Sequence, residues 1–326
     1  MAHGQYIDGV WHTGFHDTKS SGGRFKRGQT AFHNWVTLDG SAGPSGTGGF
    51  AAARGRYHLY VSLACPWAHR TIVFRKLKKL EDVIGMSVVE PVMGDRGWQF
   101  GPDADDDSVN GKKTLGEIYL MVDPHYTGRS SVPVLWDKER RTIVNNESSE
   151  IIRMFNSAFD ALTNARTDYY PAELRSEIDA INTLVFENIN NGVYRTGFAT
   201  TQHAYEEAFL DVFAALDQVE ERLSRQRYLA GDRLTEADWR LFTTLLRFDA
   251  VYYSHFKCNL RRIADYPNLS NYLRELYQVP GVAETVSMDH IKRHYYMSML
   301  HINPTGIVPL GPALDFTAKH DRGRFG

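Results

Sequence analysis

The strongest constraint on the fold is the order of hydrophobic patterns that begins at residue 57. Tyr57-His58-Leu59-Tyr60-Val61 is rich in aromatic and β-branched residues, as strands are. Residues 66–80 instead repeat their apolar side chains at the spacing of a helix. Ser87-Val88-Val89-Glu90-Pro91 is a second short run with strand character. Strand, helix and strand in this order predict a βαβ unit at the start of the compact part of the chain.

A second set of patterns lies between residues 132 and 150. Residues 132–136 and 142–144 are apolar and flank the charged turn Asp137-Lys138-Glu139-Arg140, which predicts a hairpin. Glu147-Ser148-Ser149-Glu150 then begins a helix, with carboxylates in the first turn as the helix dipole prefers. The order βαβ followed by ββα is that of a thioredoxin-like α/β domain, which we expect over residues 56–160.

The two flanking regions have different compositions. Residues 1–55 are rich in glycine and polar groups, which predicts an irregular extension that wraps the surface. From Pro171 to about His301, apolar residues recur at spacings of three and four, as in the run from Phe209 to Leu223. Thr235 and Asp238 have the spacing of a reciprocal helix cap. We therefore expect an all-α domain with a C-terminal tail over residues 170–326.

The composition excludes several classes of function. The 326 residues have a formal net charge of -2, which gives no positive field for nucleic acid or an anionic membrane. No run reaches the roughly 18 apolar residues of a membrane span, and the N-terminus has no basic and apolar secretory signal. Only two cysteines occur, as is typical of a reducing compartment, although one disulfide between them stays open. We expect a soluble cytoplasmic protein.

Cys65 is the first candidate for a catalytic group. A lone cysteine is most often a small buried hydrophobic residue. Cys65, however, lies between a predicted strand and a predicted helix whose first residue is Pro66, a favoured residue at that position. The N-terminal end of a helix favours the thiolate over the thiol and lowers the pKa of a cysteine there. The pattern therefore predicts a nucleophilic thiolate.

The fourth position of Cys65-Pro66-Trp67-Ala68 indicates how the thiolate is regenerated from a mixed disulfide. Ala68 stands where a second cysteine would close a disulfide, so the site holds a single thiol. A mixed disulfide on Cys65 must then be resolved by a thiol from solution, and glutathione is the abundant cytosolic candidate. Cys258 is an alternative resolving thiol from the helical half.

Several residues lie where a thioredoxin-like domain contacts glutathione. The proline of a dipeptide such as Val132-Pro133 is often cis, which leaves the preceding backbone free to pair with an extended peptide. Glu147-Ser148, at a helix start, can hold the amino and carboxylate groups of the γ-glutamyl end. Arg129 and Trp98 are further candidates. Each also has a purely structural explanation, namely a turn proline, a helix cap, a surface arginine and a core tryptophan.

At this point the chain resembles a known family, the glutathionyl-hydroquinone reductases, also called Xi-class glutathione transferases. The resemblance covers nearly the whole chain. The motifs that carry it are Ser62-Leu63-Ala64-Cys65-Pro66-Trp67-Ala68-His69-Arg70, Asn191-Gly192-Val193-Tyr194, Phe248-Asp249-Ala250-Val251-Tyr252, His255-Phe256-Lys257-Cys258-Asn259, His294-Tyr295-Tyr296 and Ile302-Asn303-Pro304-Thr305-Gly306. The last motif is the most specific, because ordinary glutathione transferases lack it.

The resemblance implies a glutathione-transferase fold, a homodimer, and reduction of a glutathionyl-hydroquinone through a Cys65–glutathione mixed disulfide. It implies that Tyr194 donates a proton to the leaving aromatic and that Tyr252 and Tyr295 support the thiolate. The implied glutathione contacts are Trp98, Arg129, Ser130, Ser131, Val132, Glu147 and Ser148. Glutathione is the implied co-substrate, and no metal is implied.

One position departs from the family pattern and one pair invites a different interpretation. Met299 stands where the family usually has a histidine, with His301 two residues on. His290 and His294 have the spacing of metal ligands on a helix, but no third ligand is evident, so an ordinary histidine pair is favoured. Two other functions stay open: an omega-like transferase acting on dehydroascorbate or mixed disulfides, and a non-catalytic transferase-like scaffold.

Overall fold

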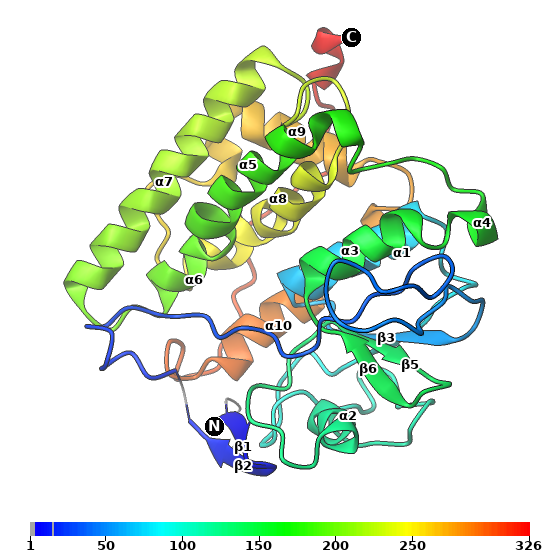
Figure 1. Cartoon of the computed structure of the whole chain (residues 1–326). Helices are drawn as coiled ribbons and strands as arrows, with labels where there is room; N and C mark the ends of the chain where they lie inside the picture. The colour runs from blue at the N-terminus through cyan, green and yellow to red at the C-terminus, as the bar shows by residue number, and fades with distance from the viewer. Residues whose placement is uncertain (1–3, 15) are drawn as a thin grey trace. The chain divides into compact units, whose positions relative to one another are not determined.

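The computed structural model describes residues 4–14 and 16–326, which form two compact units (Figure 1). Unit 1 joins the described part of Met1–Phe15 to Gly28–Asp168 and Thr285–Gly306. Unit 2 joins His16–Arg27 to Tyr169–Glu284 and Ile307–Gly326. The units alternate along the chain, unlike the continuous domains 56–160 and 170–326, whose bounds stay a prediction. The segment 285–306 groups with unit 1 because its helix bonds to residues near Pro91, as described below.

Unit 1 is built on a four-stranded mixed sheet in the order β4-β3-β5-β6. The central strand β3 (Tyr57–Val61) pairs in parallel with β4 (Gly85–Val88) and antiparallel with β5 (Val134–Asp137). The last strand, β6 (Thr142–Asn145), completes an antiparallel hairpin with β5. The predicted βαβ unit and hairpin are both confirmed.

Helices cover both faces of this sheet (Figure 1). On one face α1 (Pro66–Leu77) packs against α3 (Ser148–Ser157), and the short α4 (Asp160–Thr163) follows. The helix α1 ends three residues earlier than expected, and Lys79 just beyond it has the left-handed φ of 54°. On the other face lies α2 (Leu115–Val122), which the sequence analysis did not anticipate. A capping box between Thr114 and Glu117 begins it.

The N-terminal extension is not irregular throughout, which corrects the expectation for residues 1–55. The strands β1 (Gly4–Ile7) and β2 (Val10–Thr13) form an antiparallel hairpin. Asp8 and Gly9 at its turn both have positive φ, as the favoured two-residue hairpin turn requires. Tyr6 of this hairpin is buried and bonds through its backbone to Gly128. The extension therefore contributes to the core as well as to the surface.

Unit 2 is helical, as expected. Its α-helices are α5 (Arg175–Val185), α6 (Gly192–Gly197), α7 (Gln202–Arg225), α8 (Glu236–Arg247) and α9 (Pro267–Tyr277). Two π-helical turns, η2 (Phe186–Asn190) and η3 (Phe248–Tyr252), continue α5 and α8. Shorter turns are η1 (Ala172–Leu174), η4 (Ile263–Asp265) and η6 (Arg322–Phe325), and η5 (Ala283–Thr285) ends at the first residue of the next unit 1 segment. The long α7 buries the predicted face at Val212, Leu216 and Leu223.

The helix α8 begins at the predicted cap, where the carboxylate of Asp238 accepts from the backbone nitrogen of Thr235 at 2.8 Å and from its hydroxyl at 3.0 Å. One more helix, α10 (Met288–Ser298), belongs to unit 1. Within the described residues, no helix is long and apolar enough to cross a membrane.

Candidate active site

Cys65 occupies the N-cap of α1, as predicted. Its φ and ψ of -75° and 122° are extended, and Pro66 is the first helical residue. The carbonyl of Cys65 accepts the first helical hydrogen bond, from His69 at 2.9 Å. The side chain is partly exposed and in the free thiol form. The sulfur therefore lies at the positive end of a helix, which favours the thiolate.

The backbone beside the thiol comes from the segment that leads into β5. The Val132-Pro133 peptide bond is cis, as the dipeptide indicated. The thiol of Cys65 lies 3.7 Å from the carbonyl oxygen of Val132. One residue earlier, the carbonyl of Ser131 accepts from the hydroxyl of Tyr119 at 2.7 Å. This holds the 131–133 backbone in place next to the sulfur.

Glu147 and Ser148, two of the predicted glutathione contacts, lie at the start of α3. Glu147 is the N-cap of α3, and its carboxylate accepts from the backbone nitrogen of Ser149 at 3.0 Å. The hydroxyl of Ser148 accepts from the guanidinium of Arg70, which is 1% exposed, at 3.4 Å. This buried cation adds to the positive helix end, so an anionic group is favoured beside Ser148.

Asn146 joins these two parts of the site. Its side-chain nitrogen donates to the hydroxyl of Tyr119 at 3.0 Å, and Tyr119 in turn donates to Ser131. The backbone next to the thiol and the start of α3 are thus connected by side chains that the sequence analysis did not name. Tyr119 lies on the unanticipated helix α2, so no local pattern pointed to it.

Tyr295 lies on α10, and Trp98 packs against the same helix. The indole of Trp98 stacks on the ring of His294, with ring centres 4.7 Å apart. Nδ1 of His294 lies 3.1 Å from the carbonyl oxygen of Pro91, which engages that nitrogen with the backbone. Tyr295 is 1% exposed and meets the His294 ring edge-on. Among the residues that the structure describes, no group of three or more side chains is arranged to hold a metal ion.

The Asn303-Pro304-Thr305-Gly306 motif ends α10. The side chain of Asn303 donates to the carbonyl of Tyr296 at 2.7 Å, and its backbone nitrogen donates to the carbonyl of Met299 at 3.0 Å. Gly306 has a φ of 66°, a conformation that glycine adopts without strain. The motif therefore fixes the end of the helix that carries Tyr295, and Met299 is itself buried in this turn.

The other two predicted tyrosines meet in unit 2. Tyr194 of α6 and Tyr252, the last residue of η3, have ring centres 6.0 Å apart. Phe256 contacts both rings, at 5.4 Å from each. The guanidinium of Arg27 lies 4.8 Å from the centre of the Tyr194 ring and donates to the side-chain oxygen of Asn191. Sequence reasoning missed Arg27 because it is 167 residues before Tyr194.

Cys258 lies in a very different environment. It is fully buried, its sulfur is 3.9 Å from the carbonyl oxygen of Phe256, and it forms no disulfide. Burial raises the pKa of its thiol far above the ordinary value. A thiol kept neutral in this way is a poor nucleophile, so the resolving role left open for Cys258 has no support.

Comparison with known proteins places the chain in a family. The glutathione S-transferase N-terminal domain matches residues 64–158, and the C-terminal domain matches residues 202–275. The glutathionyl-hydroquinone reductase YqjG of Escherichia coli K12 is 57% identical, over 99% of this chain and 100% of the relative. The glutathionyl-hydroquinone reductase PcpF of Sphingobium chlorophenolicum is 55% identical, over 95% of this chain and 96% of the relative.

Solved structures of similar proteins point to the same family. The glutathione-bound structure of YqjG is matched with a TM-score of 0.91 at 54% identity, over 98% of this chain and 99% of that one. The Xi-class transferase of Natrialba magadii gives a TM-score of 0.92 at 50% identity, over 98% of this chain and 97% of that one. The chain therefore has the glutathione-transferase fold and belongs to the Xi-class glutathione transferases, the family of the glutathionyl-hydroquinone reductases.

Proposed function

We propose that this protein is a glutathionyl-hydroquinone reductase, which uses glutathione to reduce glutathionyl-hydroquinones to free hydroquinones. The observation that carries the proposal is the single thiol of Cys65 at the N-terminus of α1, with Ala68 in place of a resolving cysteine. Two relatives of at least 55% identity bear the name of this activity, and they match almost the full chain.

The reaction has two displacements at sulfur. The Cys65 thiolate attacks the glutathionyl sulfur of the substrate, so a disulfide forms and the carbon–sulfur bond breaks. The electron pair goes to the aromatic carbon, which takes a proton and leaves as hydroquinone. A second glutathione thiolate then attacks the mixed disulfide and restores the Cys65 thiolate. The aromatic is reduced, and the two glutathione sulfurs leave as oxidised glutathione.

The remaining residues have supporting roles in this proposal. Glu147 and Ser148 hold the γ-glutamyl end, Trp98 and residues 129–132 hold the rest of the tripeptide, and Arg70 favours its negative charge. Tyr194 supplies the proton to the aromatic carbon. Tyr252 and Tyr295 stabilise the thiolate by donating hydrogen bonds to it. The aromatic contacts between Tyr194 and Tyr252 support a common role for the pair.

The test is a steady-state assay with glutathionyl-menadiol and glutathione, in which free menadiol is separated and measured. The native protein should release menadiol, and Cys65→Ala should not. Release that survives Cys65→Ala would exclude Cys65 as the nucleophile. A native protein that leaves glutathionyl-menadiol intact but reduces dehydroascorbate would instead establish the omega-like activity.

We also propose that the protein is a cytoplasmic homodimer. Two free cysteines and no disulfide fit a reducing compartment. Light scattering after size-exclusion chromatography should give twice the mass of the chain, and a monomer mass would exclude the dimer.

A further inference from the structure

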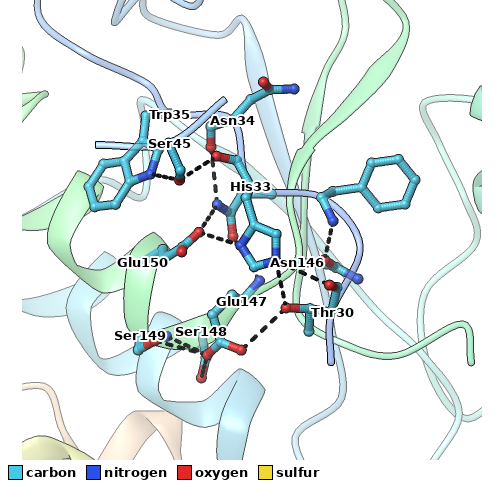
Figure 2. A network of polar contacts seen from close by, with 12 residues as sticks. Thr30, His33, Asn34, Trp35, Ser45, Asn146, Glu147, Ser148, Ser149 and Glu150 are labelled. Carbon is cyan, nitrogen blue, oxygen red and sulfur yellow. Dashed lines mark hydrogen bonds and ion pairs between the residues drawn. The ribbon is translucent and has the colours of Figure 1, made fainter. Parts of the chain in front are cut away.

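Residues 30–34 of the N-terminal extension lie against the start of α3 (Figure 2). His33 forms an antiparallel bridge with Asn145, the last residue of β6. The backbone nitrogen of Asn34 donates to Val144 at 3.0 Å, and that of Phe32 donates to the side chain of Asn146 at 3.1 Å. These bonds extend the edge of the sheet and hold the ring of His33 over the first turn of α3.

One chain of hydrogen bonds runs from His33 to the backbone of Glu147 (Figure 2). Nδ1 of His33 lies 3.0 Å from Oε2 of Glu150. The same oxygen accepts from the side-chain nitrogen of Asn145 at 2.6 Å. The side-chain oxygen of Asn145 then accepts from the backbone nitrogen of Glu147 at 2.7 Å. The ring is thus linked, through Glu150 and Asn145, to the N-cap residue of α3.

A second chain runs from the other ring nitrogen to the carboxylate of Glu147. Nε2 of His33 lies 3.1 Å from the carbonyl oxygen of Thr30 and 3.3 Å from its hydroxyl. That hydroxyl donates to Oε2 of Glu147 at 3.5 Å. Oε1 of Glu147 accepts from Ser149. Among residues 4–14 and 16–326, Oε2 accepts only this one long hydrogen bond and keeps the capacity to accept from a ligand.

The partners of His33 favour a protonated ring, because only then do both ring nitrogens donate and the Thr30 hydroxyl stays available to Glu147. The carboxylate of Glu150 and the carbonyl of Thr30 can only accept hydrogen bonds, and they lie on opposite ring nitrogens. Only the imidazolium donates from both nitrogens. Partial burial alone would lower the pKa of His33, but the bonds to Glu150 and Thr30 and the charges of Glu150 and Glu147 raise it more, so the net shift is upward. Glu150 lies in the first turn of α3, and Glu147 is its N-cap.

We propose that protonated His33 is a positioning residue for the γ-glutamyl end of glutathione, which it serves by holding Glu147 ready to accept from the substrate ammonium group. This inference rests on the proposed function. When Glu147 is held in advance, less side-chain freedom is lost on binding. Loss of the ring should therefore weaken the binding of glutathione, while the chemistry at Cys65 in the saturated enzyme proceeds as before.

The experiment measures the Kd of S-methylglutathione by calorimetry, because this ligand keeps the γ-glutamyl end and has no thiol to titrate. His33→Ala should raise the Kd about three- to tenfold. His33→Asn keeps a donor toward Glu150 only, and His33→Gln keeps one toward Thr30 only, so each should give a smaller loss. His125→Ala is the matched control, because His125 pairs with Asp8 in unit 1 but both side chains are exposed.

The pH dependence separates positioning from general stability. Deprotonation removes one of the two ring donors. The Kd of the native protein should therefore rise as the pH is raised through the elevated pKa of His33, and that of His33→Ala should change less. In the menadiol assay, His33→Ala should raise KM for glutathione and leave kcat within about twofold.

Three results would overturn parts of this account. Equal Kd values for the native protein and His33→Ala would overturn the inference and leave the proposed function intact. A second outcome is that His33→Ala lowers both kcat and the melting temperature while its Kd keeps the pH dependence of the native protein. That result would overturn the positioning role and show that His33 only stabilises the fold. A native protein that does not bind S-methylglutathione would overturn the proposed function and this inference together.

Discussion

Cys65 in unit 1 and Cys258 in unit 2 are the same residue type in opposite environments. Cys65 is partly exposed at the N-terminus of α1, beside the backbone carbonyl of Val132. Cys258 is completely buried, and desolvation raises its pKa. A helix N-terminus with access to solvent favours the thiolate that we propose for Cys65, whereas burial suppresses ionisation of Cys258.

Cys258 lies close to the residues that surround the two predicted tyrosines of unit 2. Its sulfur contacts the carbonyl of Phe256, and the ring of Phe256 contacts both Tyr194 and Tyr252. Cys258 is therefore buried next to the backbone of Phe256, whose ring contacts the two tyrosines that we assign to proton donation and thiolate support. In the proposed mechanism Cys65 performs the chemistry, and Cys258 has no chemical role.

The largest expected effect is at Cys65. Cys65→Ser removes the sulfur nucleophile and should lower the rate of menadiol release by at least about a thousandfold. Cys258→Ala is the matched control and should stay within about twofold of the native rate, because no thiol other than Cys65 and glutathione takes part. If the two variants lost activity equally, the contrast between the cysteines would be wrong.

Substitution of Tyr194 tests its proposed role as the proton donor to the leaving aromatic. Tyr194→Phe keeps the ring and removes the donor, so menadiol release should slow by roughly a hundredfold. Reduction of a preformed Cys65–glutathione mixed disulfide by glutathione should keep its native rate, because no aromatic leaves in that step. The half-buried neighbour Tyr253 provides the control Tyr253→Phe. A native rate of release in Tyr194→Phe would remove Tyr194 from the mechanism.

Arg27 should have a smaller effect on the same step. Its guanidinium lies over the Tyr194 ring, and in the proposed mechanism its charge would stabilise the phenolate that remains after proton donation. Arg27→Met should slow menadiol release roughly two- to fivefold, and Arg27→Lys should recover part of the loss. Lys26→Met removes an exposed neighbouring charge and serves as control. Equal rates for Arg27→Met and Lys26→Met would show that the cation over the ring has no role.

The smallest effect on turnover, but a clear one on stability, is expected from Cys258. Cys258→Ala leaves a small void at a fully buried position and should reduce the free energy of unfolding by about 1–2 kcal/mol, as measured by urea titration. Iodoacetamide near neutral pH should label Cys65 in the folded protein, and Cys258 only after unfolding. Labelling of Cys258 in the folded state would show that its enclosure opens readily.

The sequence predicted what local patterns control. Strand β3, helix α1 with Cys65 at its cap, the β5–β6 hairpin and the buried face of α7 all follow from the spacing of apolar residues. Helix α2 was missed because its eight residues are nearly all apolar and show no clear helical alternation. The β1–β2 hairpin was missed although Asp8-Gly9 is a recognisable turn signal.

The parts of the site that join distant segments were beyond local reasoning. The bond between His33 and Glu150 spans 117 residues, and that between Asn146 and Tyr119 spans 27. No periodicity connects such positions, because their meeting depends on how the extension and α2 pack on the sheet. The resemblance named Tyr194, Tyr252 and Tyr295, but Arg27 and His33 emerged only from the structure.

A single-turnover experiment without added glutathione tests whether Cys65 takes the glutathionyl group from the substrate. Native protein is mixed with a limiting amount of glutathionyl-menadiol, free menadiol is measured, and the protein is analysed by intact mass and peptide mapping. We predict one glutathionyl group on Cys65 for each menadiol released, and none on Cys258. Menadiol release without a glutathionyl group on Cys65, or an adduct that retains the aromatic ring, would contradict the account.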